Sequence, residues 1–165
     1  MSMTARFAIP LLAAGQAQKE LYHNEAIQTL ETLVTPAVEE GPRASPPTSP
    51  MVGACYIVAA SPSGAWTGHP FSLAAYTSGG WRFVAPIEGM TAFVRSASVW
   101  ATFRSGSWEV GILRGTNVTV AGLQVVGERT AAITSPSGGS VVDAEARSTV
   151  GQILAALRQH GLIAT

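Results

Sequence analysis

One short pattern occurs twice in the chain, and it constrains the fold more than any other feature. The run Tyr76-Thr77-Ser78-Gly79-Gly80-Trp81 is matched about 27 residues later by Phe103-Arg104-Ser105-Gly106-Ser107-Trp108. Each copy places a small polar turn with glycine between two aromatic side chains. Glycine supplies the positive φ that a tight hairpin turn requires, and aromatic residues pair across antiparallel strands. The pattern therefore predicts two β-hairpins at the centre of the chain.

Further short strands are expected on both sides of these hairpins. The candidates are residues 54–59, 72–77, 81–85, 91–95, 99–104 and 107–113, with weaker candidates at 117–120 and 123–126. Clusters of glycine, proline and serine separate them at intervals typical of a meander, a small barrel or a sandwich. Alternation of apolar and polar residues in Trp81-Arg82-Phe83 indicates strands with one buried face.

Helices are expected near both ends. Apolar residues at helical spacing favour a first helix over about residues 17–34, either continuous or broken near His23, with Asn24 as a second N-cap. A second helix, residues 144–160, starts after the single Asp of the chain, Asp143, and stops before Gly161. The predicted fold class is α+β, mainly β, with an N-terminal helix, a central module of short antiparallel hairpins and a C-terminal helix.

These elements suggest five segments along the chain. Residues 1–38 form an anchoring arm and helix, 39–52 a proline-rich linker, 53–114 the β module, 115–142 an extended β-like connector, and 143–165 the C-terminal helix. The prolines at positions 42, 46, 47 and 50 place a soft boundary between the helical head and the β module.

Apolar residues at the two ends of the chain indicate contacts with other molecules. The arm, which Pro10 keeps from being helical, offers the anchoring residues Phe7, Ile9, Leu11 and Leu12. The C-terminal helix offers a coiled-coil-like seam, the predicted oligomer interface, made of Ala146, Val150, Ile153 and Leu157. A helix of this length is not stable alone in water, so it must dock on the body or bundle with copies of itself.

The composition narrows the class of partner. Charged residues make up 12% of the chain, against about 25% in an average protein, and the formal net charge is zero. A basic surface for nucleic acid is therefore not expected, whereas subunit contacts are. No apolar run approaches the roughly 20 residues of a membrane span. The single cysteine, Cys55, lies in an apolar run and is expected to be a buried core residue.

Reactive side chains are few and lack the spacing of known catalytic or metal-binding motifs. The three histidines, His23, His69 and His160, have no motif around them. The chain is therefore predicted not to be an enzyme and to need no metal or cofactor. An enzyme hypothesis would require a spatial pair that the spacing hides, such as Glu88 with Glu128.

The aromatic residues have two interpretations. They fill the core of a small β module, or some of them present flat faces on which sugar rings stack. Trp81 and Trp108 occupy the structural position of the repeat, so Trp66 and Trp100 are the better exposed candidates for glycan binding, together with Tyr76.

Several runs resemble a known family. The first is Gln16-Ala17-Gln18-Lys19-Glu20 followed by His23-Asn24-Glu25-Ala26. The same family is indicated by two later runs, Gly64-Ala65-Trp66-Thr67-Gly68 and Gly80-Trp81-Arg82-Phe83-Val84-Ala85-Pro86, the second of which is followed by Gly89-Met90. Together they resemble the DUF2793 family of particle proteins from alphaproteobacterial prophages and gene transfer agents. The end of the chain, Asp143–Arg147 and Leu157–Ile163, looks like the closing segment of such proteins.

The resemblance implies a structural protein of a phage-like particle, located at a head spike or a tail fibre. It implies an oligomer, expected as a homotrimer, that contacts capsid, spike or tail proteins and is assembled in the bacterial cytoplasm. The short chain favours a base or connector. The alternative is a carbohydrate-binding module that recognises capsular polysaccharide of the host. The family has no catalytic residues to carry over.

Overall fold

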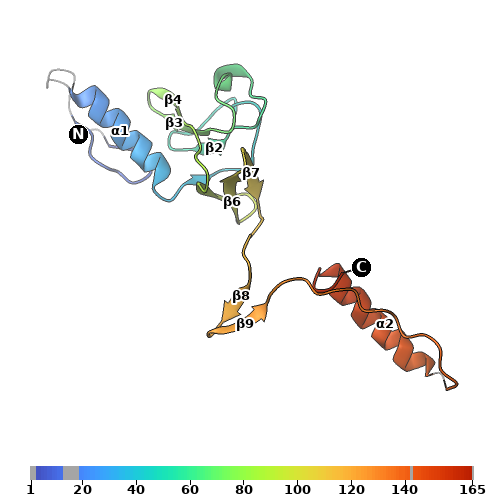
Figure 1. The fold of residues 1–165 in the computed structure, drawn as a ribbon. Coiled ribbons are helices and arrows are strands. Elements are labelled where there is room, and N and C mark those ends of the chain that lie inside the picture. The colour runs from blue at the N-terminus through green and yellow to red at the C-terminus, as the bar shows by residue number, and fades with distance from the viewer. Residues whose placement is uncertain (1–2, 13–18, 142, 165) are drawn as a thin grey trace. The chain divides into compact units, whose positions relative to one another are not determined.

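A computed structural model describes residues 3–12, 19–141 and 143–164 of the chain. The chain forms two compact units, Met1–Ile112 and Leu113–Thr165, called below the β unit and the C-terminal unit. Figure 1 shows the helices and strands of both units and labels most of them. The α+β class, mainly β with one helix near each end, is confirmed.

The first sheet of the β unit is a three-stranded meander. It consists of β2 (Cys55–Ile57), β3 (Leu73–Thr77) and β4 (Gly80–Val84), which pair antiparallel in that order. All three strands lie within ranges that the sequence predicts or one residue outside them. Because Cys55, Ile57 and Leu73 are buried on one face of this sheet, Tyr56 and Ala74 lie on the other.

The second sheet has four strands. It contains the meander of β5 (Thr91–Val94), β6 (Val99–Arg104) and β7 (Ser107–Val110), and β1 (Ala37–Val38) joins it in parallel beside β5. The sequence does not predict β1, because two residues after a proline carry no periodic signal.

The two predicted hairpins are confirmed as β3–β4 and β6–β7. In both, the repeated aromatic residues are direct cross-strand partners: Tyr76 lies opposite Trp81, and Phe103 lies opposite Trp108. The ring centroids are 4.9 Å and 5.5 Å apart. In the second turn Ser105 and Gly106 have φ values of 48° and 80°, the left-handed conformation that a two-residue hairpin turn requires.

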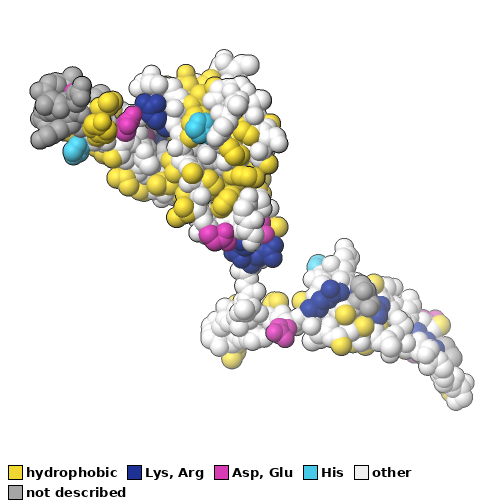
Figure 2. Space-filling view, turned by 45° about the horizontal axis from the view of Figure 1, so that its top comes forward, with side chains coloured by type: hydrophobic (Ala, Val, Ile, Leu, Met, Phe, Trp, Pro, Cys, Tyr) yellow, Lys and Arg dark blue, Asp and Glu magenta, His cyan; other side chains and the backbone are white. Residues whose placement is uncertain are grey.

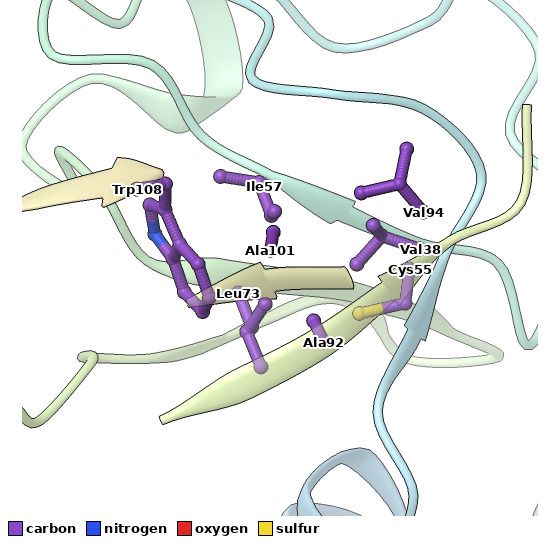
Figure 3. Close-up of a cluster of buried hydrophobic side chains, with 8 residues drawn as sticks. All are labelled: Val38, Cys55, Ile57, Leu73, Ala92, Val94, Ala101 and Trp108. Atoms are coloured by element: carbon purple, nitrogen blue, oxygen red, sulfur yellow. The ribbon is translucent and has the colours of Figure 1, made fainter. Parts of the chain in front are cut away.

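The main core lies between the two sheets. Buried side chains from both sheets gather in one space in Figure 3, namely Val38, Cys55, Ile57, Leu73, Ala92, Val94, Ala101 and Trp108. The indole nitrogen of Trp108 donates a hydrogen bond of 2.6 Å to the carbonyl oxygen of Phe71. Phe71 has a φ of 61°, which is unfavourable for a bulky side chain, so this bond helps to hold a strained residue in place.

The proline-rich segment is part of the β unit and not a separate linker. Arg43 donates its backbone N–H to Ile57 and accepts one from Ala59, so the segment runs along the edge of β2. A further backbone bond joins Ser63 to Ala44. These bonds join residues 39–52 to the β unit, and the division between the two units follows Ile112, two residues before the predicted end of the β module at residue 114.

The N-terminal helix α1 (Lys19–Leu33) is continuous. The predicted start at residues 17–18 lies outside the described residues. The helix does not break near His23, and Asn24 is not an N-cap. Instead, the Asn24 side chain exchanges two hydrogen bonds with the backbone of Leu12, at 2.9 Å and 3.1 Å, and so fastens the arm to the helix.

The C-terminal unit contains a hairpin and a helix. The hairpin joins β8 (Val118–Val120) to β9 (Leu123–Val126), which fall in the two weaker strand candidates of the sequence, although a hairpin between them was not predicted. The helix α2 (Ala144–Gln159) begins at Asp143, whose carboxylate accepts the N–H of Ala146 at 2.8 Å. It ends in a glycine motif: Gly161 has a φ of 71°, and the N–H of Leu162 donates to Leu157.

The β6–β7 turn provides a test of the hairpin. Gly106→Ala should lower the free energy of unfolding by about 1–2 kcal/mol, because an L side chain is strained at positive φ. Gly41→Ala is the matched control and should have no cost, since Gly41 has no positive φ and an added methyl group would lie in open space. Urea denaturation followed by tryptophan fluorescence measures both. Equal losses at the two positions would contradict the assigned turn.

Candidate functional site

Trp66 lies at the centre of an aromatic cluster on the outer face of the β2–β3–β4 sheet. Its ring centroid is 5.1 Å from that of Trp81 and 5.8 Å from that of Tyr56. The short 3₁₀ turn η1 (Gly64–Trp66) places the indole over the sheet, where its exposed fraction is 0%. Trp66 was predicted to be exposed and to bind a glycan, and the predicted exposure is wrong. The β2–β3 loop has to cover this sheet face, and Trp66 is the side chain that does so.

Tyr76 belongs to the same cluster. It is half-buried and packs against Trp81, which in turn contacts Trp66. Tyr76 and Trp66 are thus joined through Trp81, but only Tyr76 keeps part of its ring in solvent.

Trp100 is placed as the sequence predicts. Its side chain lies on the outer face of the four-stranded sheet and is 48% exposed. Phe93 is its direct cross-strand partner, and the two ring centroids are 5.4 Å apart at an angle of 70°. The structure therefore does not unite the three predicted glycan residues: Trp100 stands on one sheet, and Trp66 and Tyr76 stand on the other.

Polar side chains lie beside Trp100 on the same sheet. Ala101 is buried, so Thr102 and Arg104 alternate to the face that carries Trp100. Thr102 lies between Thr91 of β5 and Glu109 of β7 in the register. A carboxylate oxygen of Glu109 is 3.8 Å from Nε of Arg104. Sequence analysis missed Phe93 as part of this surface, although the alternation in Thr91–Val94 could have shown it.

Most titratable groups of the β unit have structural roles. Glu88 accepts the N–H of Ser105 at 2.9 Å and so supports the β6–β7 turn. Glu39 pairs with Arg95, and Glu40 pairs with Arg43. The His69 ring stacks on Phe83 with centroids 3.8 Å apart. Among the described residues, no three His, Cys, Asp or Glu side chains are grouped to hold a metal ion.

Cys55 is buried in the core, as predicted. Burial raises the pKa of its thiol to about 11, so the neutral thiol dominates at pH 7. A thiolate nucleophile is therefore not available at this position under ordinary conditions.

The N-terminal arm lies along α1. Phe7 and Leu12 are exposed, whereas Ile9 and Leu11 are half-buried. Beneath the arm is a partly open cavity of about 170 Å³, lined by residues of the arm, α1 and the edge of β2 and β3. The four predicted anchoring residues thus do not form a core with the β unit, and two of them face solvent.

An apolar ridge runs along the exposed side of α1. Its members recur every four residues and all face solvent: Tyr22, Ala26, Leu30 and Val34, the last just beyond the helix end. A row with this spacing is the kind that packs into the groove of another helix. Figure 2 shows apolar side chains gathered on the surface of the β unit.

The C-terminal unit leaves most of its apolar side chains in solvent. On α2 the predicted seam is open: Ala146, Val150 and Ile153 are exposed, and Leu157 is half-buried. A different face of α2 is covered, with Leu154 buried among the residues of its own unit. Arg158 donates a hydrogen bond of 2.6 Å to the Ile133 carbonyl oxygen, and Arg147 bonds that of Gly138.

Every residue of β8 and β9 is exposed. Most of the side chains of this hairpin are apolar, including Val118, Val120, Leu123 and Val125. The described helices include none with the length and apolar character needed to cross a membrane.

Comparison with known proteins gives one family. The model of a family described as "Protein of unknown function (DUF2793)" matches residues 23–109, more than half of the chain. This range runs from the first turns of α1 into β7, so it covers most of the β unit. A search of curated proteins finds no match.

The different burial of two tryptophans yields a stability prediction. Trp66→Ala should lower the free energy of unfolding by roughly 3–5 kcal/mol, because it empties the centre of the aromatic cluster. Trp100→Ala should cost less than about 1 kcal/mol, because the side chain is half in solvent already. Chemical denaturation of both variants checks this order. A larger loss for Trp100→Ala would contradict the assigned burial.

Proposed function

The chain belongs to the DUF2793 family, and we propose that it is a structural component of a phage-like particle, a connector that assembles with copies of itself. The link to phage-like particles comes from the sequence resemblance described above. The observation that carries the assembly proposal is the C-terminal unit, which leaves its apolar residues without cover.

The hairpin of the C-terminal unit is not stable by its own contacts. A two-stranded hairpin is marginally stable at best in water and needs a third strand or a covering helix. In β8–β9 neither face is covered, and Leu123 is 72% exposed. Copies of the same hairpin offer β-branched side chains and free strand edges of matching length, so association of copies would bury these side chains.

The seam of α2 favours more than two copies. The spacing of its residues places Val150 and Leu157 at a positions and Ile153 at a d position of a heptad. Ile at d, particularly with Leu at a, favours trimers or tetramers over dimers in parallel coiled coils. None of the seam residues is charged, so the seam can meet its own copy without like charges being buried. A homotrimer is the assembly that we propose.

The arm and the α1 ridge supply a second apolar surface, on the β unit. We assign it the anchoring role, in contact with capsid, spike or tail proteins of a particle assembled in the bacterial cytoplasm. The exposed side chains of Phe7, Tyr22 and Leu30 support this assignment, since a contiguous apolar surface on a protein with so few charges marks an interaction site.

The proposed role involves no catalysis. Several carboxylates accept structural hydrogen bonds, from the arm, from the β6–β7 turn and from the first turn of α2, and another forms a surface ion pair. Groups occupied in this way are poorly placed to act as general acids or bases.

The second candidate is a carbohydrate-binding module, and the exposed position of Trp100 favours it. The indole lies on an open sheet face next to the hydroxyl of Thr102 and the Arg104–Glu109 pair. An aromatic face beside hydroxyl and charged groups can stack on a sugar ring and bond its hydroxyls. Capsular polysaccharide of a bacterial host would be the ligand.

The assembly proposal is tested by the double variant V150D/I153D. Light scattering of the unchanged protein should give a mass near three times the 17.1 kDa of the chain. Burial of Val150 and Ile153 is worth roughly 1.5–3 kcal/mol each, so two aspartates should weaken association at least about 100-fold.

The matched control for that variant is Q152D/A155D. It places two aspartates at the same spacing on exposed positions of α2 outside the seam, so it should retain the oligomer. Circular dichroism would establish that both variants keep the helix. A monomeric unchanged protein at high concentration, or equal dissociation of both variants, would refute the proposal.

The glycan proposal is tested by Trp100→Ala. Binding to a panel of bacterial capsular polysaccharides should weaken about tenfold or more, because the stacking surface is lost. Tyr22→Ala removes another exposed ring, on α1, and should leave binding unchanged. Isothermal titration measures both. Absence of binding by the unchanged protein would exclude this function for the polysaccharides tested.

A further inference from the structure

The buried carboxylate of Glu31 holds the N-terminal arm to α1, in addition to the two Asn24 bonds described above. The backbone N–H groups of Arg6 and Phe7 both donate to Oε1 of Glu31, each at 2.8 Å. The hydroxyl of Thr4 bonds the same side chain. The guanidinium of Arg6 reaches the other way, to the carbonyl oxygens of Glu31 and Thr35 at the end of the helix, where a positive charge is favourable.

The arm has an internal structure that lets it move as one piece. Thr4 and Ile9 are joined by two hydrogen bonds of 3.0 Å, one between backbone groups and one from the Ile9 N–H to the Thr4 hydroxyl oxygen. Met3 and Pro10 form a β-bridge. The segment 3–12 is therefore a closed loop whose own contacts do not depend on α1.

Apolar packing supplies only part of the attachment of the arm, through the half-buried Ile9 and Leu11. The side chains of Met3, Phe7 and Leu12 face solvent. Below the arm lies the cavity of about 170 Å³, so side chains do not fill the space between the arm and the sheet edge. Because packing is incomplete around this cavity, the hydrogen bonds to Glu31 and Asn24 are an important part of the attachment.

The charge of Glu31 is favoured by its surroundings. Burial by itself raises the pKa of this carboxyl, but the bonds from Thr4, Phe7 and Arg6 and the charge of Arg6 outweigh it, so the pKa is lowered from 4.5. Among the described residues that line the cavity, Arg6 is the only other charged side chain; from β2 and β3 come Cys55, whose thiol is neutral, and Tyr76.

The geometry points to a releasable arm: residues 3–12 detach from α1 as a unit while the two sheets stay folded, and the ionised carboxylate of Glu31 keeps them attached. Release exposes the residues of α1, β2 and β3 that line the cavity. The sign of the pH effect follows from the lowered pKa. The attachment is complete at neutral pH, where Glu31 is ionised. It weakens once the pH falls below 4.5, the ordinary pKa of a Glu carboxyl, and is lost as the pH falls through the lower pKa that Glu31 has in the folded protein.

Hydrogen exchange of the full chain tests this inference through the variant Glu31→Gln. At pH 7 the amides of Arg6 and Phe7, which donate to Glu31, should exchange about 10- to 100-fold faster than in the unchanged protein, because bonds to a charged acceptor become bonds to a neutral one. Amides of β6, which report on the core, should keep their protection. Glu25→Gln, a change at an exposed position of the same helix, should alter neither.

The pH dependence separates release from general loosening. Comparing the two proteins at the same pH cancels the intrinsic exchange rate, so the ratio of arm exchange between Glu31→Gln and the unchanged protein should fall towards one as Glu31 is protonated. Unchanged arm exchange in Glu31→Gln, an equal rise in β6, or a ratio that does not vary with pH would each overturn the inference. None of these outcomes bears on the oligomer, which rests on α2 and β8–β9.

Discussion

The burial of Trp108 between the two sheets is the contact on which the β unit depends. Its ring packs against Phe103 within the β6–β7 hairpin, and its N–H bonds the carbonyl oxygen of Phe71, just before β3 of the other sheet. One side chain thus joins a local hairpin to the opposite sheet and holds a residue with positive φ. Tyr76 and Trp81 form the same kind of cross-strand pair, but they pack with Trp66 in the outer aromatic cluster. The repeated sequence pattern therefore contributes one pair to the core between the sheets and one pair to the outer face of the β2–β3–β4 sheet.

Charged side chains in this chain often have structural roles, whereas many apolar side chains lie on the surface. Several ionised side chains accept structural hydrogen bonds: buried Glu31 attaches the arm, and exposed Glu88 and Asp143 support a turn and cap α2. Apolar side chains are abundant on the outside, along α1, on β8–β9 and in the α2 seam. A protein that stays folded with this distribution gains more from association than from a charged surface, which is the physical basis of the proposed assembly.

Local signals in the sequence were sufficient for most of the secondary structure. The glycine turns predicted the hairpins, and Asp143 and Gly161 predicted the ends of α2. Weak local signals failed. The strand β1 was not predicted, because it has only two residues. Asn24 was considered as an N-cap, but its side chain bonds the backbone of Leu12 in the arm. Of the candidate site, Trp100 was correctly expected to be exposed, whereas Trp66 was not exposed and Phe93 was missed.

The sequence by itself determined the strands, the turns and the helix ends, because each depends on residues within a few positions of one another. Only the tertiary structure decided which tryptophan is exposed, since that depends on which loop covers which sheet: the β2–β3 loop covers one outer face with Trp66, and the face that carries Trp100 stays partly open. It also decided that Glu31 holds the arm. Glu31 lies 25 positions after Arg6 and 24 after Phe7, and it binds their backbone N–H groups. A contact with the backbone leaves no side-chain pattern from which the sequence could predict it.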